Sequence, residues 1–287
     1  MGTTEEHSFE TFIGIDLGGG KGKNTAVAML ARSDEGVRVR FVGRKDRKRR
    51  PFYDEHLVAY LRAHHAGALV AVDAPLTRTV CTRCVLPRCP GLAQCSDPVV
   101  EWFRGPGVDL APKRTSSHGK PLSTPYTQRA CEVVLYRRYG ILPRETLGQG
   151  MGPLTARAHY LRRALEDIFE RDRNLIEVYP KATIHRIFGA DVARRYKRGA
   201  DTWRVRAEML ETLSEHLRFD IWREGCLRDD HAFDAVLCAY TAYLYHQQSW
   251  QLPEAGREIF AQDGWIWFPR PEEGLVESNG SDEPEET

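Results

Sequence analysis

Hydrophobic and polar positions in the first part of the chain alternate as they do in β-strands. Phe12–Leu17 is a short apolar run that ends in three glycines, and Thr25–Leu30 and Val37–Val42 resume the pattern after turn-rich gaps. Three successive strands with short connections predict an antiparallel meander. Apolar residues at helical spacing over Tyr53–His64 and a continuous apolar run over Ala66–Val72 then predict a helix and a buried central strand.

The later part of the chain alternates between helical and strand-like patterns. Helical periodicity runs through Leu154–Arg171 and Ala200–Phe219, and His231–Tyr245 is the most apolar helical segment. Short apolar runs predict further strands over Asn174–Val178 and Gly264–Phe268. This mixture of strands and helices is typical of an α/β fold.

One long segment breaks this alternation. Residues 75–154 are rich in Pro, Gly, Ser, Thr and Cys, and only Thr127–Tyr139 shows helical periodicity. We therefore expect an insertion over residues 76–125, after the fourth strand of a single domain that spans residues 11–270. Residues 1–10 are expected to form a flexible tail and residues 271–287 a disordered acidic tail.

The composition is that of a water-soluble globular protein, with 41% hydrophobic and 28% charged residues among 287. No apolar run approaches the roughly 20 residues that a membrane-spanning helix needs, and the first residues lack the features of a secretory signal. We therefore expect a cytoplasmic protein with no membrane partner. The patterns make no prediction of its oligomeric state.

The formal net charge of +1 conceals a basic body. Ten acidic residues and no Lys or Arg lie in residues 1–10 and 271–287, which leaves 41 basic against 30 acidic side chains between them. A basic run, Arg44–Arg50, contributes to this excess. Such an excess favours a polyanionic partner, of which nucleic acid is the commonest, although it also serves solubility.

Four acidic residues interrupt otherwise apolar elements. Asp16, Asp73 and Glu177 interrupt or end predicted strands, and Asp234 interrupts the most apolar helix. Carboxylates are rarely buried without a partner, so we expect the four to converge on a divalent cation, with Mg²⁺ or Mn²⁺ suited to oxygen ligands. His231 lies three residues before Asp234, on the same helix face, and joins the four acids as a candidate catalytic residue. Glu177 could instead face outward from its strand.

The meander, the acids that end the first and fourth strands, and the His231-x-x-Asp234 pair together resemble the ribonuclease-H-like nuclease fold. Short segments spread over nearly the whole domain resemble the domain of unknown function numbered four hundred and twenty-nine, whose members are usually described as predicted nucleases: Ile13–Asp16, Val72–Leu76, Glu177–Pro180, Tyr196–Lys197, His231–Ala235 and Gly264–Pro269.

This resemblance implies a mixed five-stranded sheet flanked by helices and a metal-dependent nuclease. Asp16 and Asp73 would be the central metal ligands, and Asp234 and His231 would complete the site. Two cations would then take part in the reaction. One would activate water for attack on a phosphodiester, and the other would stabilise the leaving oxygen. Lys197 would contact a substrate phosphate or remain a surface base.

The glycine-rich turn after Asp16 supports an alternative. Gly18–Thr25 resembles the first phosphate-binding turn of actin-like sugar kinases, in which backbone N–H groups hold ATP phosphates, and Lys21 and Lys23 would contact the substrate. No second Asp-x-Gly turn and no adenosine loop follow, which favours the nuclease. A non-catalytic nucleic-acid-binding protein is a third hypothesis.

Two further patterns are candidates for binding. Cys81, Cys84, Cys89 and Cys95 form a C-x2-C-x4-C-x5-C run, for which we expect a structural Zn²⁺, an iron–sulfur cluster or free thiols. Arg129, in the pattern Arg129-x-x-Glu132, is a candidate contact to a phosphate or to the site.

Overall fold

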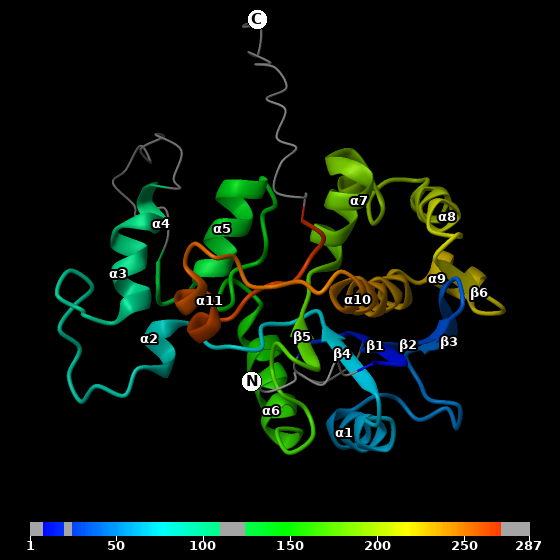
Figure 1. Ribbon diagram of the computed structural model, residues 1–287, viewed down its shortest axis with the longest axis horizontal. Coiled ribbons are helices and arrows are strands. Elements are labelled where there is room, and N and C mark those ends of the chain that lie inside the picture. Colours follow the sequence, from blue (N-terminus) through cyan, green and yellow to red (C-terminus); the bar gives the residue numbers. More distant parts are fainter. Residues whose placement is uncertain (1–7, 20–24, 110–123, 271–287) are drawn as a thin grey trace, which may run out of the picture.

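Six strands form one mixed sheet in the computed structural model, which describes residues 8–19, 25–109 and 124–270 (Figure 1). Their order across the sheet is β5-β4-β1-β2-β3-β6. β1, β2 and β3 pair antiparallel, whereas β4 is parallel to β1, β5 to β4 and β6 to β3. The strands are β1 (Thr11–Asp16), β2 (Ala26–Ser33), β3 (Gly36–Gly43), β4 (Ala68–Val72), β5 (Leu175–Glu177) and β6 (Leu217–Phe219).

Helices cover both faces of this sheet (Figure 1). In chain order they are α1 (Asp54–Ala63), α2 (Val80–Arg83), α3 (Pro98–Arg104), α4 (Pro106–Asp109), α5 (Ala130–Tyr139), α6 (Gly152–Ala164), α7 (Pro180–Arg195), α8 (Thr202–Thr212), α9 (Arg223–Arg228), α10 (Asp230–Gln247) and α11 (Arg257–Asp263). Among the described residues, none of these helices has the length and apolar character needed to cross a membrane.

The core divides into two layers because side chains alternate along each strand. Phe12 on β1 and Leu69 on β4 belong to the larger layer, which packs beneath α10. Ile13, Ile15 and Val70 belong to the smaller layer, which α1 and α6 cover from the other side. Residues of even number on β1 and of odd number on β4 therefore face α10, and this parity sets where the acidic residues point.

Most of the expected elements are present. The three-stranded meander, the first helix, the central strand at Ala68–Val72 and the apolar helix α10 lie where the pattern predicts them. Sequence analysis also located α5 and β5 within a few residues, whereas α6 ends at Ala164, before the expected Arg171.

The expected five-stranded sheet is wrong, because the sheet has a sixth strand at its β3 edge. A single helix was predicted over Ala200–Phe219, but α8 ends at Thr212, and Leu217 opens β6, which pairs parallel to β3. Leu217 is buried as a residue of β6 and not of a helix. Its apolar side chain also fits the helical spacing of the preceding residues, which is why the sequence predicted a longer helix.

Gly264–Phe268 is not a strand of the sheet. This segment makes an isolated β-bridge, in which Trp267 pairs with Val178. The backbone N–H of Trp267 donates to the Glu177 carbonyl over 2.8 Å. The apolar pattern arises because this segment is buried against the core.

The expected insertion carries three short helices, α2, α3 and α4, between β4 and α5 (Figure 1). Val99, Val100 and Phe103 of α3 belong to the same hydrophobic core as the sheet, with which α5 and α11 also pack. The residues described in this region therefore extend the main core. Residues 110–123, 1–7 and 271–287 lie outside the described residues, and the two predicted tails lie largely among them.

Candidate functional site

Three of the four predicted acids meet at one end of the sheet. Asp16 ends β1, Asp73 follows β4 directly, and Asp234 lies in the second turn of α10. One carboxylate oxygen from each lies within 4.8 Å of those from the other two. Asp16 and Asp73 have the parity that faces α10, so strand alternation directs both toward the helix that carries Asp234.

Each carboxylate has a different environment. Asp16 Oδ2 lies 2.5 Å from Nδ1 of His231, and Asp234 Oδ2 pairs with the Lys197 ammonium. The other oxygen of Asp234, Oδ1, is shielded from solvent and has no hydrogen-bond partner among the described residues. Asp73 keeps part of its surface in the cleft. Buried carboxylate oxygens without donors are costly, which makes this group a candidate cation site.

Asp73 and Asp234 hold protons unusually tightly. Burial raises the pKa of Asp73 well above its ordinary range, and the neighbouring Asp16 and Asp234 carboxylates raise it further. Burial also raises the pKa of Asp234, to about 7, against the opposing effect of Lys197. A cation bound among these oxygens would remove the repulsion that raises both pKa values.

The pKa values of the two basic partners, His231 and Lys197, are raised as well, because the carboxylates favour their charged forms. The hydrogen bond to Asp16 raises the pKa of His231 above its ordinary value, so this imidazole is protonated more readily. Burial lowers the pKa of the Lys197 ammonium, but Asp234 raises it by more, and Lys197 stays charged. Lys197 is therefore part of the site, with about a third of its side chain exposed (35%).

The N-terminus of α10 is fixed beside the acids by Asp229, whose side chain accepts hydrogen bonds from the backbone N–H groups of His231 and Ala232. Asp230, the next residue, is the first residue of the helix. Arg44 donates to Asp229 over 2.7 Å and so connects the basic run after β3 to the same helix end. Two consecutive aspartates made the capping position ambiguous in the sequence.

The acidic group lies in a cleft of about 630 Å³. Besides the acids, its walls carry basic side chains that sequence analysis did not select: Arg144, Lys181, Arg194 and Arg198. Gly18 and Gly19 line the same cleft, so the glycine-rich turn borders it. Lys21 and Lys23, expected to contact substrate, lie outside the described residues.

The ends of the glycine-rich turn are held by Arg157 of α6. Its Nη1 donates to the Gly18 carbonyl over 2.9 Å and to Thr25 Oγ1 over 2.6 Å, and its Nε donates to Asp54 over 2.5 Å. Arg157 is buried, although the sequence shows it only as one of several arginines on an amphipathic helix. No local sequence signal distinguishes it.

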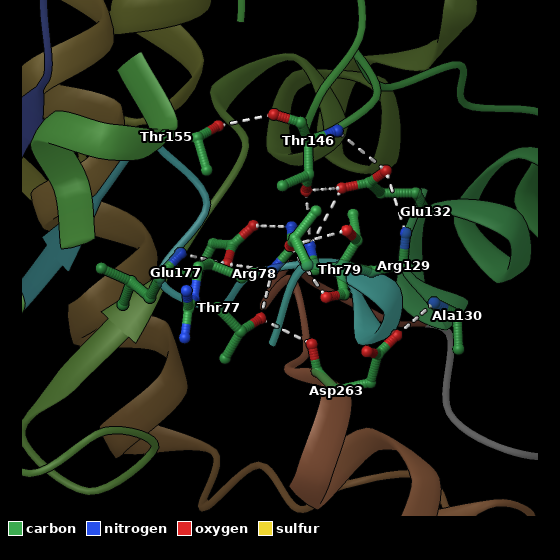
Figure 2. Close-up of polar contacts among 12 residues, drawn as sticks. Thr77, Arg78, Thr79, Arg129, Ala130, Glu132, Thr146, Thr155, Glu177 and Asp263 are labelled. Atoms are coloured by element: carbon green, nitrogen blue, oxygen red, sulfur yellow. Dashed lines mark hydrogen bonds and ion pairs between the residues drawn. The ribbon is translucent and has the colours of Figure 1, made fainter. Parts of the chain in front are cut away.

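Glu177 does not join the acidic group. Ile176 and Val178 belong to the core layer beneath α10, so Glu177 points away from that layer, as the outward alternative in the sequence allowed. Its carboxylate forms a two-pronged ion pair with the guanidinium of Arg129, with Nη1 to Oε2 at 2.7 Å, and also accepts from the Leu76 N–H over 2.9 Å (Figure 2).

Arg129 is likewise committed to the interior. The side chain is 1% exposed, and its donors also contact Glu132, Thr146 and Thr77 (Figure 2). Asp263 accepts from the N–H of Ala130 next to it, over 2.6 Å. Arg129 therefore connects β5, α5 and the loop after β4, and its donors are occupied by this network.

The cysteine run does not form a compact metal site in the structure. Cys81 and Cys95 are half-buried, and Cys84 and Cys89 are exposed. Burial raises the pKa of the Cys81 thiol, with smaller contributions from the other three. Within the described ranges, only the acidic group brings three candidate ligands within 4.8 Å, so the zinc or iron–sulfur site stays a prediction.

Comparison with known proteins identifies the family and nothing finer. No curated protein and no solved structure matches the chain. The family described as "Protein of unknown function (DUF429)" matches residues 14–256, which include all three acids of the cluster, His231 and Lys197. The chain therefore belongs to the DUF429 family.

Proposed function

We propose that this protein is a metal-dependent nuclease with a ribonuclease-H-like fold, which hydrolyses phosphodiester bonds at the cluster of Asp16, Asp73 and Asp234. The observation that carries the proposal is the convergence of three carboxylates within 4.8 Å, with Asp234 Oδ1 buried and unpaired among the described residues. Three oxygen ligands of this kind suit Mg²⁺ or Mn²⁺.

The sheet supports the fold assignment. An antiparallel meander of β1, β2 and β3 is followed by β4, which pairs parallel to β1, and acids lie at the ends of β1 and β4. The sequence resemblance implied this same combination, with a last helix that carries the His231-x-x-Asp234 pair. The sixth strand and the helices α2–α4 are additions at the periphery of that arrangement.

The chain's own residues would divide the work at the cleft. Asp16, Asp73 and Asp234 would hold the divalent cations, which supply Lewis-acid activation of water and of the scissile phosphate. His231 orients the Asp16 carboxylate through a contact of 2.5 Å, and Lys197 holds Asp234 in place and neutralises part of the cluster's charge. Lys181, Arg194 and Arg198 in the cleft walls would attract the phosphates of the strand.

Nucleic acid is the proposed substrate because two independent features favour a polyanion. The cleft has basic walls around an acidic floor, and the chain between its two acidic ends carries 41 basic against 30 acidic residues. A basic wall brings phosphates to carboxylates that would otherwise repel them, provided that cations occupy the cluster.

The test is cleavage of labelled DNA and RNA, each offered single-stranded, duplex and branched, with Mg²⁺, Mn²⁺ or EDTA. Asp16→Asn and Asp73→Asn are each expected to lower cleavage by more than about 100-fold, because even the outer partners of metal ligands typically contribute 10- to 100-fold. Asp201→Asn, an exposed acid beside α8, is the matched control and should cleave as wild type does. Circular dichroism verifies that each variant is folded.

Activity that survives in both cluster variants would place the chemistry elsewhere and overturn the proposal. The phosphotransferase alternative rests on Gly18 and Gly19, which line the cleft beside Asp16. Metal-dependent ATP turnover without cleavage of any nucleic acid would favour that alternative. Salt-sensitive binding of nucleic acid with neither activity would favour the non-catalytic binding protein.

A further inference from the structure

A second pocket, of about 500 Å³, is lined by several arginines and lies near the acidic cleft. Arg78, Arg83, Arg162 and Arg171 line it together with His159, and the acidic residues in its walls are Glu166 and Glu170. The adjoining surface hollow adds Arg163. Arg83 is paired with Asp263 and Arg171 with Asp172, whereas no ion pair to Arg78 or Arg162 occurs among the described residues.

Donors in this pocket lack partners. Arg83 Nη1 donates to Asp263 Oδ1 over 2.6 Å and to the Arg78 carbonyl over 2.9 Å, but Arg83 Nη2 is shielded from solvent with no hydrogen-bond partner among the described residues. His159 Nε2 has the same status. Buried polar atoms are normally paired, so these two nitrogens indicate a missing partner.

The electrostatics of the pocket point to the same conclusion. Burial and, to a lesser extent, Arg162 and Arg78 together lower the pKa of His159 to about 4, so the imidazole is neutral near pH 7. Burial and the neighbouring Arg171 also lower the pKa of Arg162. Arg171 and Arg78 therefore disfavour the charge on Arg162, whereas Glu166 and Asp172 favour it.

Two segments pass from the acidic cleft into this pocket. In the chain after β4, Asp73 and Pro75 line the cleft, whereas Thr77 and Arg78 line the pocket. In α6, Leu154 lines the cleft and Arg162 the pocket, eight residues later, which is about 12 Å along a helix. Arg162 also donates to the Leu76 carbonyl over 2.8 Å, so it supports the connecting loop itself.

We propose that this arginine pocket binds a phosphate group, and that the phosphate belongs to the nucleic-acid strand whose scissile bond lies at the acidic cluster. Arginine forks match phosphate oxygens in pairs, and Arg83 Nη2 carries N–H groups that have no acceptor among the described residues. The identity of the strand rests on the proposed function, whereas the affinity for phosphate does not. The pocket would hold the strand at a second point and so select substrates that are long enough to reach it.

Arg78→Gln is the variant that tests the pocket. The Arg78 side chain is exposed, and no hydrogen bond or ion pair to it occurs among the described residues, so its removal leaves the supporting contacts intact. Arg204→Gln is the matched control, because Arg204 is an exposed arginine on α8 and does not line the pocket.

Two measurements separate the sources of the phosphate. The first is calorimetric titration of the metal-free protein with inorganic phosphate and with tripolyphosphate. The second is fluorescence anisotropy of labelled single-stranded DNA and RNA oligonucleotides in EDTA over a range of KCl concentrations, so that neither measurement requires cleavage. Arg78→Gln is expected to lower the affinity for both kinds of ligand by about 10-fold. It should also reduce the salt dependence of oligonucleotide binding by the equivalent of about one phosphate contact.

The outcomes are distinct. Weaker binding of both probes in Arg78→Gln, with Arg204→Gln unchanged, supports the pocket and its strand, even if no substrate is cleaved. Weaker phosphate binding with unchanged oligonucleotide binding supports a phosphate site and overturns its assignment to the strand. Equal binding of both probes by wild type and Arg78→Gln overturns the pocket, whatever the cleavage assays show.

Discussion

The backbone of Gly14 on β1 lies directly against the backbone carbonyl of Ala235 on α10. A Cβ atom at position 14 would overlap that carbonyl and the Ala239 N–H, and would lie 2.9 Å from Ala239 Cβ. This close approach seats α10 on the sheet between Asp16 and Asp234, each of which is one or two residues from the contact. The acidic cluster therefore depends on a residue that has no side chain.

Gly14→Ala is expected to lower the free energy of unfolding by about 3 kcal/mol or more, because strand and helix must separate to admit the methyl group. Urea denaturation measures this change. The matched control is Gly225→Ala on α9, where nothing lies within 4 Å of the added Cβ. Alanine there should be neutral or stabilising by up to about 1 kcal/mol, from helix propensity. Equal stability of the two variants would contradict the close contact.

Asp73→Asn is expected to raise the melting temperature of the metal-free protein, because it removes one of three mutually repelling carboxylates. The same change should abolish the additional stabilisation by Mg²⁺ or Mn²⁺ that wild type shows. Differential scanning calorimetry in EDTA and in each metal measures both effects. A variant less stable than wild type in EDTA would show that the Asp73 carboxylate makes a favourable contact in the metal-free protein.

The stability of the metal-free protein should fall as the pH rises from about 6.5 to about 8. An unfolded Asp has a pKa of about 3.9, whereas folding raises the pKa of Asp234 to about 7, so the folded state binds more protons and loses this advantage as Asp234 ionises. The raised pKa of His231 acts in the same direction. The lowered pKa values of His159 and His185 act oppositely, but below about pH 6.5.

Melting temperatures at successive pH values in EDTA check this slope, and saturating Mg²⁺ should flatten it, because the cation takes the place of the proton. Asp234→Asn provides the control and should also flatten the EDTA profile. A slope that persists unchanged in that variant would assign the pH dependence to other groups.

Lys197→Met is expected to destabilise the metal-free protein by about 1 to 3 kcal/mol. The change leaves Asp234 buried without its ammonium partner, although the partial exposure of Lys197 reduces the effect below that of a fully buried pair. Lys181→Met is the matched control, because Lys181 lines the same cleft and forms no ion pair among the described residues. Chemical denaturation in EDTA should separate the two variants, and identical midpoints would contradict the role given to Lys197.

Glu177→Gln should lower the free energy of unfolding by about 3 to 5 kcal/mol, because it leaves the Arg129 guanidinium buried with an incomplete set of acceptors. Any metal-dependent cleavage per folded molecule should stay within a few-fold of wild type, since the carboxylate belongs to the ion pair. Cleavage activity divided by the folded fraction of the sample distinguishes a structural from a catalytic role of Glu177. A loss of 100-fold with stability intact would return Glu177 to the catalytic group.

The sequence by itself determined the elements that carry the site. Short apolar runs placed Asp16 and Asp73 at strand ends, and helical spacing put His231 and Asp234 on one face, because these signals depend only on neighbouring residues. Glu177 shows where that reasoning ends. An acid at a strand end can face either side of the sheet, and only the packing of Ile176 and Val178 beneath α10 decided that it meets Arg129.

Tertiary structure also decided every partner that lies far away in the chain. Arg129 donates to Glu132, three positions later, but it also pairs with Glu177, 48 positions later, and Lys197 pairs with Asp234, 37 positions away. β6 likewise joins the sheet through β3, far earlier in the chain, although its residues continue the apolar spacing of a helix. Local patterns record the burial of a residue, whereas the identity of its neighbour depends on how distant segments pack, which no short stretch of sequence encodes.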